Sequence, residues 1–185
     1  MDRQPVLAGD RLTLRPLTRD DWEALFAVAC NREIWAGHPS HDRWDEPVFR
    51  AFFDEGLASG GALAIVDISS GRIVGSSRYG QPEADMPGEI EIGWSFLARS
   101  YWGGGYNAEF KRLMLAHAFG HFERVIFQVG ADNVISRKAM ANIGGILTDR
   151  TRSYERGGAM VEHVIFEITR DSFAHGPLAA SPRSN

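Results

Sequence analysis

Three consecutive glycines lie where they could bind a phosphate group. Gly103, Gly104 and Gly105 follow the alternating apolar run Glu89–Leu97 and precede an amphipathic segment that starts near Tyr106. A strand, a tight turn and a helix N-terminus in this order present backbone N–H groups and the positive end of a helix dipole to an anion. Glycine at the turn lets the ligand approach the backbone closely. We therefore predict a domain that holds a phosphate-bearing ligand, the alternative being a flexible strand-to-helix connection.

The glycine loop does not match the common nucleotide-binding patterns. Tyr106, Asn107 and Ala108 follow the glycines, so the dinucleotide fingerprint G-x-G-x-x-G is not met. No Gly-Lys-Ser/Thr follows either, which argues against a nucleoside-triphosphate P-loop. We therefore expect a phosphate-bearing ligand that is bound by neither of these two loop types.

A second glycine-flanked segment lies downstream, at residues 133–143. It follows a strand-like run at 125–129, and its apolar residues recur at helical spacing. Asp132 or Asn133 would cap the helix, and Gly144 and Gly145 would end it. Ser136 would then fill the first turn.

Taken together, these motifs resemble the GNAT superfamily of acetyl-CoA-dependent N-acetyltransferases, and most closely the branch of ribosomal-protein N-terminal acetyltransferases. The resemblance covers residues 9 to 170 approximately, and it rests on Glu-Ile-Gly-Trp at 91–94, the stretch 102–111, Asn-x-x-Ser at 133–136 and Ile-Gly-Gly at 143–145. The family loop is usually written Arg/Gln-x-x-Gly-x-Gly/Ala. Gly105 fits its central glycine, whereas Trp102 and Asn107 depart from its first and last positions.

The resemblance implies the GNAT fold, an α/β (α+β) arrangement in which helices flank a twisted, mixed, mostly antiparallel sheet. The fourth and fifth strands of that fold correspond to Glu89–Leu97 and 125–129. They splay apart, and the cofactor lies in the gap. The elements expected from the sequence agree with this: strands at 11–17, 62–68, 72–78, 89–97, 125–129, 146–154 and 160–169, and helices near 22–30, 46–59, 105–119 and 133–143.

The implied cofactor is acetyl-CoA, and the resemblance assigns residues to each part of it. Backbone near Phe96 would pair with the pantetheine arm, the glycine loop would hold the pyrophosphate, and nearby cations, Lys111 among them, could meet the 3′-phosphate. The predicted cofactor-binding residues are Phe96, Leu97, Ala98, Arg99, Trp102, Gly103, Gly104, Gly105, Tyr106, Asn107, Asn133, Ser136, Arg137 and Lys138.

Amide formation from a thioester requires a base for the amine, stabilisation of an oxyanion and a hydrogen bond or proton for the leaving thiolate. Glu91 is the leading candidate for the base, with Glu155, Tyr154 and Glu162 as alternatives. Strand alternation would place Glu91 with Ser95 on one face of the strand, and Glu89 would be a solvated neighbour. The resemblance places Ser136 beside the sulfur; the alternative is that Asn133 and Ser136 only begin a helix.

The acceptor implied by the resemblance is a primary amine, on a protein N-terminus, a peptide or a small molecule. Residues expected to line its pocket are Trp35, Trp44, Tyr154 and Glu155. His38 and His41 form no metal site by spacing, because no third ligand accompanies them. An alternative of a different class stays open: the chain could be a non-catalytic domain that binds or senses acyl-CoA.

Length and composition indicate one globular domain. The chain has 185 residues, a net charge of −4 and a single cysteine, which disfavours nucleic acid as a partner and excludes an intrachain disulfide. We find no signal peptide and no apolar run long enough for a membrane, so we expect a cytoplasmic protein. We expect the domain to span 1–173 and the tail 174–185 to be disordered. A homodimer is compatible with the resemblance, and nothing in the sequence requires one.

Overall fold

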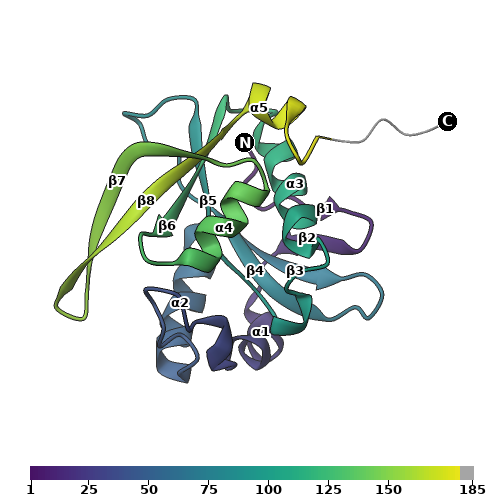
Figure 1. Cartoon of the computed structure of the whole chain (residues 1–185). Helices are drawn as coiled ribbons and strands as arrows, with labels where there is room; N and C mark the ends of the chain where they lie inside the picture. Colours follow the sequence, from purple (N-terminus) through teal and green to yellow (C-terminus); the bar gives the residue numbers. More distant parts are fainter. Residues whose placement is uncertain (180–185) are drawn as a thin grey trace.

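The computed structural model describes residues 1–179. In this part of the chain eight strands form one sheet in the order β1-β2-β3-β4-β5-β6-β8-β7, with helices on both faces (Figure 1). Neighbouring strands are antiparallel except for the parallel pair β5 and β6. The predicted fold class is confirmed. The strands are β1 (Leu7–Ala8), β2 (Leu12–Pro16), β3 (Ala62–Asp67), β4 (Ile73–Tyr79), β5 (Glu89–Leu97), β6 (Arg124–Gly130), β7 (Ile146–Arg156) and β8 (Ala159–Thr169); the α-helices are α1 (Trp22–Ala29), α2 (Glu46–Ser59), α3 (Tyr106–Ala118), α4 (Val134–Asn142) and α5 (Arg170–His175).

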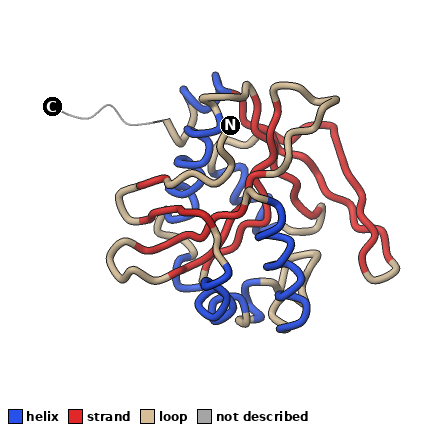
Figure 2. Tube along the Cα trace, turned by 180° about the vertical axis from the view of Figure 1, so that it is seen from behind, coloured by secondary structure: helices blue, strands red, loops and turns tan. Residues whose placement is uncertain are grey.

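The sheet separates two apolar clusters, one under each helical layer. Helices α1 and α2 cover one face and α3 and α4 the other (Figures 1 and 2). Phe49 and Phe53 of α2 pack against Trp22 of α1 in the first cluster, which we call the aromatic core. Phe110 and Met114 of α3 lie in the second, which we call the main core. Each helix is amphipathic because its apolar residues recur on one side.

Strands β5 and β6 separate after a short parallel stretch. They pair only from Glu89 with Arg124 to Glu91 with Ile126. Beyond that point β5 keeps its antiparallel partner β4, and β6 keeps its antiparallel partner β8. The predicted splay between these two strands is therefore confirmed, and a gap opens beyond Glu91.

A bulge at Trp94 divides β5 into two halves. Ser76 pairs with Phe96 and Arg78 with Gly93, so the single residue between them on β4 faces two residues on β5. Trp94 has a φ of 53°, which is rare for a bulky side chain. The predicted alternation is therefore wrong beyond Gly93. Ser95 faces Lys111 of α3, and Phe96 packs in the aromatic core.

The C-terminal region differs from the predicted domain end. Helix α5 continues past Phe173 to His175, and Leu178 is 7% exposed within the main core. Burial of Leu178 stabilises this segment, so the predicted disorder does not hold for residues 174–179. The rest of that predicted tail, 180–185, lies outside the described residues. Within 1–179, the helices lack the length and apolar character needed to cross a membrane.

Candidate active site

Three cavities occupy the region where β5 and β6 separate. The glycine-loop cavity, about 240 Å³, lies between Trp102 and α4. The gap cavity, about 140 Å³, lies between the separated strands. The hairpin cavity, about 290 Å³, lies under the β7–β8 hairpin. His38 lines all three, and Ser136 lines both of the first two, so the cavities adjoin one another.

The glycine loop has the backbone conformation that its sequence predicts. Gly103, Gly104 and Gly105 have φ values of 78°, 56° and 82°, which side-chain-bearing residues rarely adopt. Arg11 fixes the loop, because its guanidinium donates to the Gly104 carbonyl (2.7 Å) and to Glu109 (2.7 Å). In the described chain, the amide N–H groups of these three glycines donate to no protein acceptor. The loop thus presents free donors just before α3.

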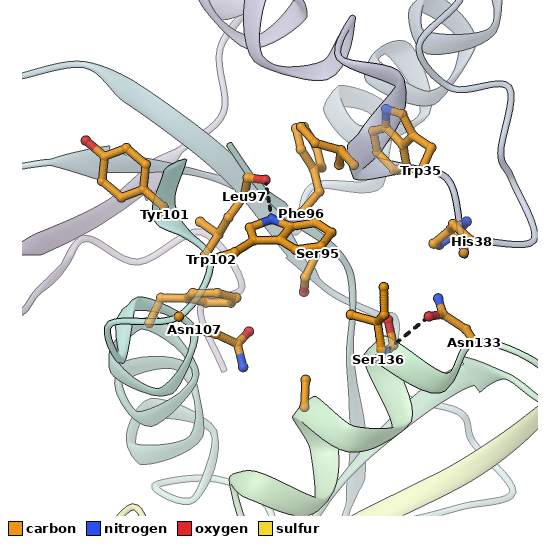
Figure 3. A pocket seen from close by; sticks show the side chains of 16 residues that line it. Trp35, His38, Ser95, Phe96, Leu97, Tyr101, Trp102, Asn107, Asn133 and Ser136 are labelled. Carbon is orange, nitrogen blue, oxygen red and sulfur yellow. Dashed lines mark hydrogen bonds between the residues drawn. The ribbon is translucent and has the colours of Figure 1, made fainter. Parts of the chain in front are cut away.

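The indole of Trp102 binds a backbone carbonyl in the segment that we predicted to bind the pantetheine arm of the cofactor. Its indole Nε1 donates to the Leu97 carbonyl (3.0 Å) (Figure 3). The Ala98 N–H is also engaged, because it donates to Val74 (2.7 Å) on β4. Trp102 itself lines the glycine-loop cavity with Phe96 and Leu97. Two backbone groups near the end of β5, the Leu97 carbonyl and the Ala98 N–H, are therefore already engaged within the protein.

The predicted cofactor residues fall into two sets. Those that line the glycine-loop cavity are Phe96, Leu97, Trp102, Gly103, Asn107, Asn133 and Ser136. Those that line none of the three cavities are Ala98, Arg99, Gly104, Gly105, Tyr106, Arg137 and Lys138. Arg99 lies near Glu33 (3.8 Å), and Arg137 donates to the Ala131 carbonyl (2.9 Å).

Asn133 and Ser136 form the start of α4 and also line two of the cavities. The Asn133 side-chain oxygen accepts from the Ser136 N–H (3.1 Å) and so caps α4 (Figure 3). Asn133 is 6% exposed, and both residues line the glycine-loop and gap cavities. The cap therefore places the Asn133 amide and the Ser136 hydroxyl at these two cavities.

Glu91 lines the hairpin cavity, and it is the last residue of β5 that pairs with β6. Its carboxylate accepts from Gln128 Nε2 (2.9 Å) of β6, and the other amide atom of Gln128 accepts from the Tyr154 hydroxyl (2.5 Å). Burial raises the pKa of Glu91 to about 7. A carboxylate with this pKa can take up a proton near neutral pH.

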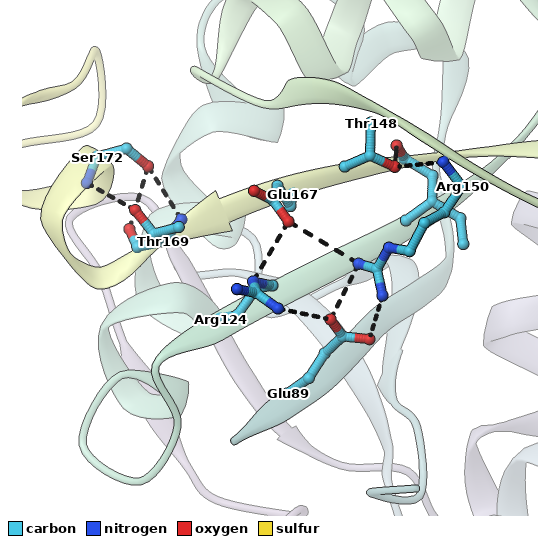
Figure 4. A network of polar contacts seen from close by, with 8 residues as sticks. Glu89, Arg124, Thr148, Arg150, Glu167, Thr169 and Ser172 are labelled. Atoms are coloured by element: carbon cyan, nitrogen blue, oxygen red, sulfur yellow. Dashed lines mark hydrogen bonds and ion pairs between the residues drawn. The ribbon is translucent and has the colours of Figure 1, made fainter. Parts of the chain in front are cut away.

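Glu89, two residues earlier, has a different environment (Figure 4). It is 6% exposed and accepts from both terminal nitrogens of Arg150 (3.2 and 3.0 Å). Arg124 lies 3.7 Å from the same carboxylate and 3.3 Å from Glu167. The expectation that Glu89 is solvated is therefore wrong, because β6 and β7 bring two arginines to it.

The residues predicted to line the pocket for the acceptor substrate do not all line the same cavity. Tyr154 and Glu155 line the hairpin cavity. Trp35 is buried against Phe96 and lines the glycine-loop cavity instead. Trp44 lines none of the three cavities and lies under the Arg32 guanidinium. An ion pair between Arg156 of the hairpin and Asp42 joins the hairpin to the segment before α2.

Sequence reasoning missed the role of three lining residues. His38 accepts the Ser40 N–H at Nδ1 (2.8 Å), and burial with Arg43 and Arg156 nearby lowers its pKa to about 3, so the neutral ring carries its proton on Nε2. His163 lines the gap and hairpin cavities. Lys111, predicted as a cation near the 3′-phosphate, is only 2% exposed and lines the gap cavity. Its register on α3, on the same side as Phe110 and Met114, was the available signal.

No group of three or more His, Cys, Asp or Glu side chains within 1–179 is arranged to hold a metal ion. His38 and His41 also differ in exposure, since His41 is at the surface. The polar groups that line the three cavities include amides, hydroxyls, two imidazoles, the carboxylates of Glu91 and Glu155, and the amine of Lys111.

Comparison with known proteins supports a common architecture. A family model described as an acetyltransferase (GNAT) domain matches residues 11–146. The structure is similar to a GCN5-related N-acetyltransferase from Brucella melitensis (TM-score 0.77, 18% identity, 95% of this chain and 82% of that one). It is also similar to Mycobacterium smegmatis RimJ in complex with CoA-disulfide (0.70, 21%, 94% and 88%) and to an acetyltransferase from Agrobacterium tumefaciens (0.67, 26%, 90% and 95%).

Proposed function

The chain belongs to the GNAT acetyltransferase family, and we propose that it transfers the acetyl group of acetyl-CoA to a primary amine by direct attack in a ternary complex. The acceptor in this proposal is a protein N-terminus, a peptide or a small-molecule amine. One observation supports it most: a cavity that holds a carboxylate of raised pKa adjoins the glycine-loop cavity through the gap between β5 and β6.

The residues present fit acetyl-CoA. The free N–H groups of Gly103, Gly104 and Gly105 suit a pyrophosphate, and the glycine-loop cavity is lined largely by apolar side chains that suit a pantetheine arm. The Asn133 amide is the polar group that would hold that arm. Bound acetyl-CoA supplies a thioester, whose carbonyl carbon is the electrophile.

In this proposal Glu91 removes a proton from the acceptor amine in the hairpin cavity. The hydrogen bond from Gln128 fixes the carboxylate, and Tyr154 fixes Gln128 in turn. A pKa near 7 leaves a large fraction of Glu91 ionised at neutral pH while keeping it basic enough to take a proton.

Ser136 and His38 would act on the donor side. The Ser136 hydroxyl lines both the glycine-loop and the gap cavity, so we assign it a hydrogen bond to the thioester sulfur. His38 presents a neutral Nε2–H donor at the junction of the three cavities. We assign it a hydrogen bond to the oxygen that becomes negative during attack.

The first experiment is calorimetric titration of the purified protein with acetyl-CoA, CoA and ADP. We expect acetyl-CoA and CoA to bind more tightly than ADP, because the pantetheine arm occupies the glycine-loop cavity. A panel of N-terminal peptides and small amines is then assayed for thiol release. Equal affinity for ADP would contradict the cofactor assignment. Binding without turnover on any amine would instead support an acyl-CoA-binding or sensor domain.

A further inference from the structure

Lys111 is a buried amine for which the protein supplies no counter-ion. It is 2% exposed and lies between the rings of Phe110 and Phe127, with its Nζ 5.0 and 5.1 Å from the ring centroids. In residues 1–179, no carboxylate oxygen lies within 4.0 Å of this Nζ. Lysine is rarely buried without such a partner, because burial disfavours its charge. Its burial therefore makes Lys111 a candidate for a functional role.

The polar contacts of Lys111 leave donors free at the gap cavity. Its Nζ donates one hydrogen bond, to Ser95 Oγ (2.7 Å), out of the three that an ammonium can make. Ser95 faces α3 only because the bulge at Trp94 shifts the alternation of β5. The same cavity is lined by Ser136 and Asn133 of α4. The lysine and the predicted sulfur-binding serine thus line one cavity of about 140 Å³.

The surroundings also set the protonation of Lys111. Burial lowers its pKa to about 7, while Glu91 acts in the opposite direction. Two further titratable groups, His38 and His163, line the gap cavity, and burial lowers the pKa of each, so both are neutral near pH 7. Glu109, two residues before Lys111, is bound to Arg11. A base and an acid that titrate near neutral pH therefore lie near the same gap.

We propose that Lys111 is a further catalytic residue, which donates a proton to the sulfur of CoA as the thioester is cleaved. The proposal rests on the proposed acetyl transfer. In that reaction the acceptor nitrogen forms a bond to the acetyl carbon, the carbon–sulfur bond breaks, and its electron pair stays on sulfur. Glu91 takes one proton from the nitrogen, and Lys111 gives one to the sulfur. Water returns a proton from Glu91 to Lys111, which restores both groups.

The test measures the thiol pKa of CoA bound to the protein, from the ultraviolet absorbance of the thiolate as pH is raised. The thiolate and the Lys111 ammonium favour each other and titrate as a pair, so in the wild-type complex we expect the apparent thiol pKa to lie below that of free CoA. In Lys111→Met it should return to the value of free CoA. Lys111→Arg, which keeps a positive charge, should retain part of the shift, and Ser136→Ala separates the serine's hydrogen bond from the effect of charge.

Turnover and stability complete the test. Lys111→Met should lower kcat by roughly 10²-fold or more and remove the loss of kcat/KM on the alkaline side of neutral pH. Its melting temperature should rise, more at pH 6 than at pH 9, because the folded pKa lies below the ordinary value of 10.5 and the buried charge is costly at low pH.

Each result separates the two proposals. An unchanged thiol pKa in Lys111→Met, with CoA bound normally, would overturn the role of Lys111 and leave the acetyltransferase proposal intact. Acetylation of Lys111 itself, detected by mass spectrometry after incubation with acetyl-CoA, would show a nucleophile rather than an acid. Failure of the wild-type protein to bind CoA would overturn both proposals.

Discussion

Glu89 and Glu91 lie two residues apart on β5, yet their environments are opposite. Glu89 lies where β5 pairs with β6, and two arginines neutralise it. Glu91 is the last residue of β5 that pairs with β6; within residues 1–179 no cation lies within 4.0 Å of its carboxylate, and the amide of Gln128 is its partner. The comparison shows how one strand can hold the sheet together at one end and leave reactive groups available at the other.

The largest expected effect comes from Glu91→Gln. Loss of the base should lower kcat by roughly 10²- to 10⁴-fold with the affinity for CoA unchanged. The substitution should also raise the melting temperature at pH 8. The folded pKa of about 7 lies above the ordinary value of 4.5, so the buried carboxylate costs stability as pH rises through this range, and glutamine removes that cost. A fully active Glu91→Gln would exclude Glu91 as the base and direct attention to Tyr154 or Glu155.

Glu89→Gln is the matched control. It should lower stability and change activity little, the opposite of what we expect for Glu91→Gln. It leaves Arg150 and Arg124 without their shared carboxylate, at a cost of about 1 to 3 kcal/mol in the free energy of unfolding. Activity per folded molecule should change little, because Glu89 lines none of the three cavities. Chemical denaturation and a thiol-release assay measure the two quantities. Loss of turnover without loss of stability would contradict the division between the two carboxylates.

The pH dependence of the wild-type enzyme sharpens the same comparison. Glu91 must be ionised to act as a base, so kcat/KM, calculated with the concentration of the unprotonated acceptor amine, should fall roughly tenfold per pH unit below about 7. Glu91→Gln should lack this acidic limb, whereas Glu89→Gln should retain it. A wild-type profile that stays flat from pH 5 to pH 8 would rule out Glu91.

A smaller effect is expected from Gly104→Ala in the glycine loop. The φ of 56° would cost about 1 to 2 kcal/mol with a Cβ present, and that Cβ would lie 3.3 Å from the Tyr106 ring. Displacement of the loop should weaken CoA binding roughly tenfold, in line with this cost. Gly158→Ala imposes similar strain away from the glycine loop, because Gly158 has a φ of 81° in the β7–β8 turn and has open space around it. It should leave CoA affinity unchanged in calorimetry.

Tyr154→Phe should have the smallest effect. It removes one hydrogen bond to Gln128, which is worth about 0.5 to 1.5 kcal/mol. Glu91 keeps its direct partner, so we expect a loss of roughly two- to tenfold in kcat/KM. A loss as large as that of Glu91→Gln would instead indicate that Tyr154 takes part in the proton transfer.

Local patterns predicted most of the fold. The bounds of α2 and β5 match the sequence-based ranges, because apolar periodicity and the glycine at position 60 mark their ends. Asn133 begins α4, as its type and position indicate. The two-residue β1, the short α5 and the burial of Leu178 were not predicted, since they depend on contacts with distant parts of the chain.

The candidate site was predicted less completely. The glycine loop, Ser136 and Glu91 could be found from motifs that lie close together in sequence. The arginines around Glu89, the position of Gln128 and the burial of Lys111 could not, because strand pairing and helix packing create them. Trp35 reaches a different cavity from the one predicted for the same reason.

The bulge at Trp94 decides which face of β5 each later residue occupies. Without the bulge, the same residues would follow a single alternation along the whole strand. Ser95 would then turn toward the aromatic core, and a phenylalanine ring would stand beside the ammonium of Lys111. Substitutions that favour regular pairing at Trp94 should therefore disturb the gap cavity more than substitutions elsewhere in this strand.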